Sequence, residues 1–187
     1  MVDSSKSEEI LLIQMRQGKA DIFSQVYEAY VNRIYRFIYL KMATREDSED
    51  LTSQTFFRAL EYLSRPDAQV ENLQAFLYRV ARNQVADYYR AKGERKSDLE
   101  LNEMSEMMAD TNLDLSLEFD KQLDLETVRR ALKEINSDYQ DAIIWYYVEE
   151  QTITEISQIL EKNQGTVRVL IHRAVKSLKE ALQKNVQ

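Results

Sequence analysis

The chain has 187 residues, with 25 basic and 32 acidic side chains, three glycines, one proline and no cysteine. The absence of cysteine excludes disulfides and thiolate chemistry, and a single histidine excludes a histidine-based metal site or proton relay. Hairpins use glycine, asparagine and proline in their turns, so the scarcity of these residues argues against sheets and predicts an all-α protein.

No apolar stretch reaches the roughly 18–20 residues that a membrane span requires. The first thirty residues carry Asp3, Glu8 and Glu9 among short apolar runs, which is not the pattern of a signal peptide. We therefore expect a cytoplasmic protein without membrane insertion.

The net charge of −7 comes from the middle of the chain. Residues 1–93 hold 13 basic and 13 acidic side chains, residues 94–126 hold 3 and 11, and residues 127–187 hold 9 and 8. This distribution predicts two helical domains, 1–93 and 124–187, joined by an acidic linker, 94–123. The linker could be disordered, form a short amphipathic helix or imitate nucleic acid in a basic groove.

Four helices are expected in the first domain, over residues 7–17, 21–42, 44–63 and 72–92. Thr44 begins the third, with Glu46 and Asp47 in its first turn, where carboxylates suit the helix dipole. The breaker cluster at residues 64–67 should end this helix, and Gly93 should stop the fourth.

Helical spacing divides the third helix into two sides. One side is expected to face the core, and its residues are Leu51, Thr55, Phe56, Ala59, Leu60 and Leu63. Asp50, Ser53, Gln54 and Phe57 share another side, and an exposed aromatic framed by polar groups is typical of a protein interface. Alternatively, the apolar stripe is wide and Phe57 belongs to the core.

The fourth helix combines basic and aromatic groups on one side. This stripe consists of Arg79, Arg82, Asn83, Ala86, Tyr89 and Arg90, with Asp87 at its edge. Such a pattern suits a nucleic-acid single strand, because charges follow the backbone while rings stack on unpaired bases. The opposite side, expected to be buried, consists of Leu73, Phe76, Leu77, Val80, Ala81 and Tyr88. Alternatively, the arginines only solvate a surface helix, with Tyr89 half-buried.

The second domain is expected to contain helices over residues 124–135, 137–150, 152–160 and 164–183. Thr152 and Glu155 form a capping-box pattern. A short helix, a tight turn at residues 161–163 and a longer basic helix are the layout of a helix-turn-helix.

The last helix is predicted to read duplex DNA. Its core side consists of Val167, Leu170, Ile171, Ala174, Leu178 and Leu182. The other side consists of Gly165, Arg168, Val169, His172, Arg173, Lys176 and Lys179, and residues 164–179 include no acid. Asn163 is expected to cap the helix so that its free N–H groups can meet a phosphate, while Gly165 permits close approach of the backbone. Alternatively, this is a solvated basic face on a helix hairpin.

Three segments together resemble the extracytoplasmic-function (ECF) family of bacterial sigma factors. SEDLTSQTFFRAL (48–60) resembles the family's polymerase-binding helix, and NLQAFLYRVARNQVADYYR (72–90) resembles its −10 promoter helix. TITEISQILEKNQGTVRVLIHRAVKSLKEAL (152–182) resembles its −35-reading helix-turn-helix. The resemblance covers nearly the whole chain, and it implies a sigma2-like domain and a sigma4-like domain that initiate transcription without catalysing a reaction.

The resemblance also implies roles for particular residues. Asp50, Gln54 and Phe57 would bind the β′ clamp helices of core RNA polymerase. The −10 element would be opened by Asn72, Arg79, Asn83, Asp87 and Arg90, joined on the same face by Arg82 and Tyr89. The −35 element would be read by Gly165, Thr166, Arg168 and Arg173, with Asn163, Val169, His172 and Lys176 beside them. Loop 64–71 would trap a flipped-out base, and the linker would lead toward the RNA exit path.

Partners other than polymerase and promoter DNA would include an anti-sigma factor, while no cofactor, metal or catalytic residue is expected. One alternative is a helix-turn-helix regulator that acts without core polymerase. Another is a helical adaptor whose basic faces bind an acidic protein.

Overall fold

The computed structural model describes residues 20–65, 67–93 and 125–185. Within these ranges every regular element is a helix, which confirms the predicted all-α class. The chain divides into two compact units, Met1–Lys92 and Gly93–Gln187. The helix expected at 7–17 and the linker at 94–123 lie outside the described residues, so both remain predictions.

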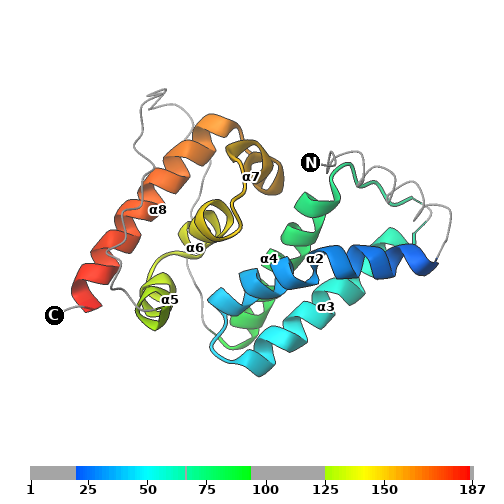
Figure 1. Ribbon diagram of the computed structural model, residues 1–187, viewed down its shortest axis with the longest axis horizontal. Helices are drawn as coiled ribbons and strands as arrows, with labels where there is room; N and C mark the ends of the chain where they lie inside the picture. The colour runs from blue at the N-terminus through cyan, green and yellow to red at the C-terminus, as the bar shows by residue number, and fades with distance from the viewer. Residues whose placement is uncertain (1–19, 66, 94–124, 186–187) are drawn as a thin grey trace. The chain divides into compact units, whose positions relative to one another are not determined.

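The first unit is built from three helices that pack against one another: α2 (Ala20–Lys41), α3 (Arg45–Leu63) and α4 (Leu73–Ala91) (Figure 1). Phe37 of α2 meets Tyr78 of α4 edge to face, with ring centroids 5.6 Å apart. Lys41 is also buried, and its ammonium group lies 5.2 Å from the centre of the Phe37 ring. Apolar contacts such as Phe37–Tyr78 hold the helices together, while the Lys41 cation lies on an aromatic ring of its own helix.

The helix ends in this unit follow the capping signals in the sequence. The Thr44 hydroxyl accepts a hydrogen bond from the backbone N–H of Asp47, and the Asn72 side chain accepts one from Ala75. Gly93, just beyond α4, has a φ of +74°, the left-handed conformation that glycine adopts without strain. The predicted starts at Thr44 and Asn72 and the stop at Gly93 are confirmed.

The buried side of α4 differs from the predicted one. Phe76, Val80 and Tyr88 are only half-buried, whereas Tyr78 and Val85 are buried. The reason is that α4 packs against both α2 and α3, so its buried arc is wider than one stripe and is turned toward residues 74, 78 and 85.

The second unit contains α5 (Leu125–Glu134), α6 (Ser137–Ile143), the π-helical turn η2 (Ile144–Val148), α7 (Ile153–Leu160) and α8 (Gln164–Asn185). Helix α8 packs against α5, α6 and α7 (Figure 1). Trp145 is fully buried and is among the largest side chains of this core. Its neighbours Ile143 and Ile144 are buried as well, whereas Val148 is exposed.

The continuous helix expected over residues 137–150 is wrong in its second half. After Ile143 the backbone widens, so that the N–H of Glu149 donates to the carbonyl of Ile144, five residues back, at 2.9 Å. Glu150 then takes a φ of 52° and ends the element. Hydrogen bonds of this span are rare and are usually single-turn insertions in α-helices, which residue periodicity does not reveal.

No helix in the described part of the chain combines the length and apolar character needed to span a lipid bilayer.

Candidate nucleic-acid interface

Helix α3 presents an exposed aromatic surface. The Phe57 side chain is 63% exposed, and Gln54 and Asp50, one and two turns before it, are exposed as well. Leu60, which we expected in the core, is also exposed, so two apolar side chains one turn apart face solvent. Phe56, the neighbour of Phe57, is buried and meets Tyr27 edge to face at 4.8 Å. The interface prediction for Phe57 is therefore favoured over its alternative, a core position.

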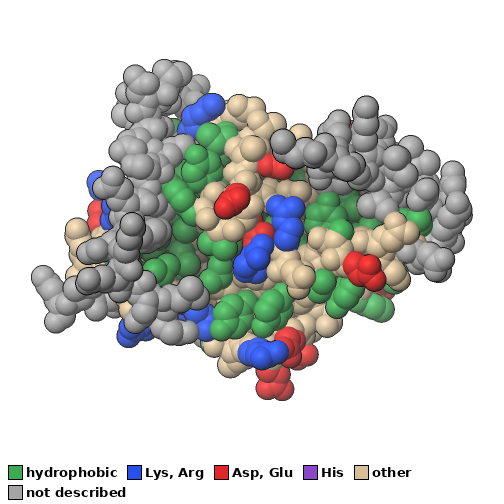
Figure 2. Space-filling model, in the orientation of Figure 1, with side chains coloured by type: hydrophobic (Ala, Val, Ile, Leu, Met, Phe, Trp, Pro, Cys, Tyr) green, Lys and Arg blue, Asp and Glu red, His purple; other side chains and the backbone are tan. Residues whose placement is uncertain are grey.

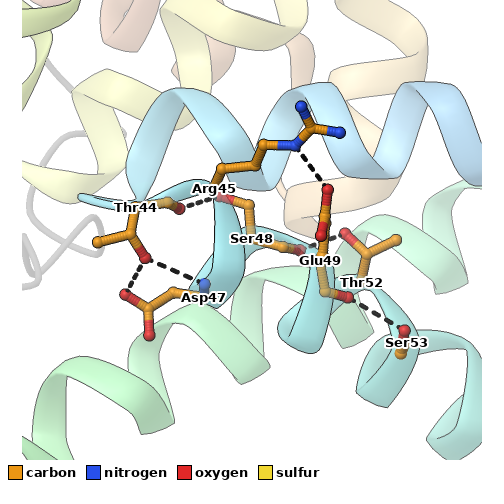
Figure 3. Close-up of polar contacts among 7 residues, drawn as sticks. All are labelled: Thr44, Arg45, Asp47, Ser48, Glu49, Thr52 and Ser53. Carbon is orange, nitrogen blue, oxygen red and sulfur yellow. Dashed lines mark hydrogen bonds and ion pairs between the residues drawn. The ribbon is translucent and has the colours of Figure 1, made fainter.

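The N-terminal end of α3 is fixed by polar contacts (Figure 3). The Thr44 hydroxyl accepts from the Asp47 N–H at 3.1 Å and donates to the Asp47 carboxylate at 2.6 Å. The hydrogen bond from Thr44, and after it one from Tyr88 of α4, lowers the pKa of the Asp47 carboxyl below its ordinary value. Arg45 and Glu49 form an exposed pair at 2.7 Å, and Figure 2 shows basic and acidic side chains together at this end of α3.

The predicted −10 stripe on α4 is only partly exposed. Asn83 and Arg90 are exposed, while Arg79 and Arg82 are half-buried. Asn72 is half-buried, and its side chain caps the helix. The stripe therefore does not form one uniformly exposed face.

Tyr89 makes a contact within the protein that was not predicted from the sequence. Its hydroxyl donates a hydrogen bond to the backbone carbonyl of Lys41, at the end of α2. The ring is half-buried and edge-on to Tyr88 at 5.4 Å. The structure thus gives Tyr89 a role in holding α4 to α2, and its stacking on bases stays a prediction.

Asp87 lies between two guanidinium groups. Arg90 of the same helix contacts its carboxylate at 2.9 Å, and Arg58 of α3 lies 3.8 Å away. Sequence reasoning did not select Arg58, because its position on another helix gave no signal that it lies next to the stripe. The negative charge of Asp87, at the edge of the basic stripe, is therefore close to the positive charges of Arg90 and Arg58.

Loop 64–71 is flanked by aromatic rings. Tyr62 and Phe76, on either side of the loop, have ring centroids 5.1 Å apart with planes tilted by 34°, and the Arg65 guanidinium lies 5.8 Å from the Tyr62 ring. Val70 is buried and anchors the loop to the unit. The aromatic pair was not selected from sequence.

The helix-turn-helix geometry of α7 and α8 rests on a series of caps. Thr152 and Glu155 form the predicted capping box. Helix α7 ends at Glu161, whose φ of 55° is left-handed, and the Asn163 side chain then accepts from the Thr166 N–H at 2.8 Å. A Cβ on Gly165 would lie 3.3 Å from the Asn163 side-chain oxygen, so glycine at this position keeps the cap free of crowding.

The two faces of α8 agree with the prediction except at Val169. All six residues expected in the core are buried, namely Val167, Leu170, Ile171, Ala174, Leu178 and Leu182. Arg173, Lys176 and Lys179 are exposed, Gly165 is exposed, and Arg168 and His172 are half-buried. Val169 is only 8% exposed, so placing it on the open face was wrong. Thr166 is buried too, and its hydroxyl donates to the Asn163 side chain at 3.0 Å.

Among the described residues, no group of histidine, aspartate and glutamate side chains is arranged to hold a metal ion. What these residues offer is two separate sets of cations, on α4 and α8, and one aromatic surface, on α3. Such surfaces bind polyanions and proteins.

Comparison with known proteins identifies the family. A family model described as sigma-70 region 2 matches residues 26–95, and a model described as sigma-70, region 4 matches residues 125–178. The ECF RNA polymerase sigma factor BldN of Streptomyces coelicolor is 30% identical over 186 residues, which cover 96% of this chain and 68% of BldN. This chain belongs to the ECF family of RNA polymerase sigma factors.

A second relative is also an ECF sigma factor, and a solved sigma-factor structure has the same fold. SigW of Bacillus subtilis is 28% identical over 178 residues, covering 90% of this chain and 93% of SigW. The solved structure of the sigma factor RpoE in complex with the anti-sigma factor NepR, from Bartonella quintana, has the same fold, with a TM-score of 0.60. It is 21% identical, covering 86% of this chain and 96% of that chain.

As an ECF sigma factor, the chain binds RNA polymerase and directs promoter-specific initiation, and it is not an enzyme. Nothing in these likenesses supports the alternative of a regulator that acts without polymerase.

Proposed function

We propose that the first unit docks on polymerase through α3 and opens the −10 element through α4, while α8 reads the −35 duplex. The observation that supports this most is the pairing of surfaces within the first unit. Helices α3 and α4 pack together, so exposed Phe57 and the exposed Asn83 and Arg90 belong to one body. Docking on polymerase would therefore fix where the DNA-binding side of α4 lies.

The polymerase surface would consist of Asp50, Gln54 and Phe57, with Leu60 added from the structure, and would meet the β′ clamp helices. Interface energy concentrates in a few buried aromatic anchors surrounded by polar groups. A 63% exposed phenylalanine beside a carboxylate and an amide has that composition. Phe57 would be the anchor.

The −10 surface would consist of Asn72, Arg79, Arg82, Asn83, Asp87, Tyr89 and Arg90. Opening DNA costs a few kcal/mol for each unstacked step. Stacking an unpaired base on an aromatic side chain returns about 1–3 kcal/mol. The Tyr62–Phe76 pair beside loop 64–71 offers such rings, so a base flipped into that loop would be held there.

The −35 surface would consist of Asn163, Gly165, Thr166, Arg168, His172, Arg173 and Lys176, with Val169 supporting the helix from its buried side. Asn163 and Thr166 would orient the first turn of α8, because they hydrogen-bond each other. Arg168 and Arg173 would reach base edges or phosphates in the major groove. A bidentate contact to a base gives about 1–3 kcal/mol of discrimination.

The division into domains 1–93 and 124–187 with a linker at 94–123 is part of this proposal. So is an anti-sigma partner, which the complex of RpoE with NepR supports by likeness. The protein would act in the cytoplasm, where polymerase and chromosome meet.

The decisive test is run-off transcription by purified core polymerase on a pool of genomic promoter fragments, with and without the chain. We expect promoter-dependent transcripts only with the chain. For the −35 surface, Arg173→Ala should weaken promoter binding and make its salt dependence shallower by about 0.9 in the log–log slope, the value for one phosphate contact. Lys184→Ala, an exposed cation in the last turn of α8, is the matched control and should change neither quantity. No transcript from any fragment, together with no binding to core, would refute the proposal.

A further inference from the structure

Arg58 of α3 is held by a side chain of α4. With the Gln84 amide turned so that its oxygen faces Arg58, that oxygen accepts hydrogen bonds from Nη1 at 2.8 Å and Nε at 3.0 Å. Gln84 itself is buried. Because the Gln84 amide is buried and held in place, its two hydrogen bonds fix the orientation of the Arg58 guanidinium plane.

The same guanidinium keeps donors for another ligand. Arginine has five N–H groups in a planar fork, and the Gln84 oxygen occupies one on Nε and one on Nη1. The Arg58 side chain is 55% exposed. An arginine already held in one orientation loses little conformational entropy when it binds an anion.

The charges around Arg58 favour an anion from outside the protein. Asp87 is the nearby carboxylate, but at 3.8 Å it is a loose partner, and it is already bound by Arg90 at 2.9 Å. Ion pairs that are this exposed contribute little binding energy, so one Asp87 carboxylate does not neutralise both Arg58 and Arg90. Arg58, Asp87 and Arg90 together carry a net charge of +1.

We propose that Arg58 binds a phosphodiester oxygen of the promoter strand that α4 holds, which extends the DNA surface from α4 across the seam onto α3. This inference rests on the proposed function. The polymerase-binding helix would then contribute directly to promoter binding, one residue after Phe57. The competing explanation is that Arg58 only clamps α3 to α4.

The test uses the full chain bound to core polymerase and a fluorescein-labelled fork-junction DNA, single-stranded through −10, cut from a promoter recovered by run-off transcription. Binding is measured by anisotropy over a salt series for Arg58→Ala, Arg58→Lys and Arg45→Ala. Arg45 is the matched control, an exposed arginine on the same helix that pairs with Glu49. Core affinity and thermal unfolding are measured for each variant.

We expect Arg58→Ala to bind the fork DNA roughly 10-fold more weakly, as for loss of a hydrogen bond to a charged group. Its salt slope should become shallower by about 0.7, the value for one phosphate of a single strand. Arg58→Lys should retain the slope, because the charge remains, and Arg45→Ala should match the wild-type chain.

An unchanged slope for Arg58→Ala, with a lower unfolding midpoint, would show that Arg58 is only a clamp. Asn83→Ala and Arg90→Ala distinguish failure of the Arg58 inference from failure of the proposed DNA binding by α4. If these weaken DNA binding and Arg58→Ala does not, the inference fails and the proposed function stands. If none of the three has an effect, promoter binding by α4 fails, and the inference fails with it.

Discussion

The side-chain amide of Gln164 donates a hydrogen bond to the hydroxyl of Thr154 at 3.1 Å, which joins the first turn of α8 to α7. Both residues are exposed, so the bond is surrounded by water. It lies next to the Asn163 cap, which hydrogen-bonds the Thr166 N–H and hydroxyl. The start of α8 is thus fixed twice, once to its own backbone and once to α7.

Asn163→Ala should lower the free energy of unfolding of the second unit by about 1 kcal/mol, the usual cost of losing an N-cap side chain. It should also weaken −35 binding, because the first turn of α8 would fray. Urea unfolding and duplex binding measure the two effects. Gln164→Ala is the control, since a surface substitution changes stability by about 0.5 kcal/mol or less. Equal losses for the two variants would contradict the assignment of the cap to Asn163.

Glu161→Gly should stabilise the second unit. Glu161 has a φ of 55°, and a left-handed backbone costs a residue with a Cβ about 1–2 kcal/mol. Glycine also makes the unfolded chain more flexible, which lowers stability by about 0.4–1 kcal/mol. The free energy of unfolding should therefore rise by roughly 0.5–1 kcal/mol. Lys162→Gly, at a neighbour without a positive φ, should destabilise instead. Thermal unfolding of both variants checks the opposite signs.

Asp47→Asn should flatten the pH dependence of stability in acid. The pKa of the Asp47 carboxyl is lowered in the folded chain, first by the Thr44 hydroxyl and then by Tyr88. Its stabilising contribution is therefore complete above the ordinary aspartate value, about 3.9, and is lost as pH falls through the lower folded value. Tyr88→Phe should remove only part of the effect. Thermal unfolding midpoints measured across this pH range would contradict the assignment if the wild-type and Asp47→Asn curves run parallel.

Phe57→Ala should weaken core polymerase binding at least 10-fold, as expected for a central aromatic anchor. Because the ring is 63% exposed, the free energy of unfolding should change by about 0.5 kcal/mol or less. The buried neighbour gives the contrast: Phe56→Ala should cost about 3–5 kcal/mol of stability. Pull-down titrations and urea unfolding separate the two. Full polymerase affinity in Phe57→Ala would remove α3 as the docking surface.

Helix ends and the α8 core could be predicted because they depend on local chemistry. Thr44, Asn72 and Thr152 cap helices by hydrogen bonds within three residues, and Gly93 supplies a left-handed stop. The six core residues of α8 follow from helical spacing alone.

The errors come from tertiary packing. Val169 is buried because α8 packs against three helices, which makes its buried arc wider than an amphipathic stripe. Leu60 is exposed although Ala59 and Leu63 are buried, because it lies one turn from Phe57 on the outer side of α3. Arg58 was missed for a related reason, since its partners Gln84 and Asp87 lie on another helix.

The central claim is that the first unit opens DNA at −10 while α8 holds the duplex at −35, both in complex with polymerase. Permanganate footprinting of unpaired thymines on a recovered promoter, combined with DNase protection, tests it most directly. We predict reactive thymines near −10 with the wild-type chain. The double variant Arg79→Ala, Asn83→Ala should lose this reactivity but keep −35 protection, whereas Arg168→Ala, Arg173→Ala should lose both. Reactive thymines that persist unchanged in the first double variant would contradict the account.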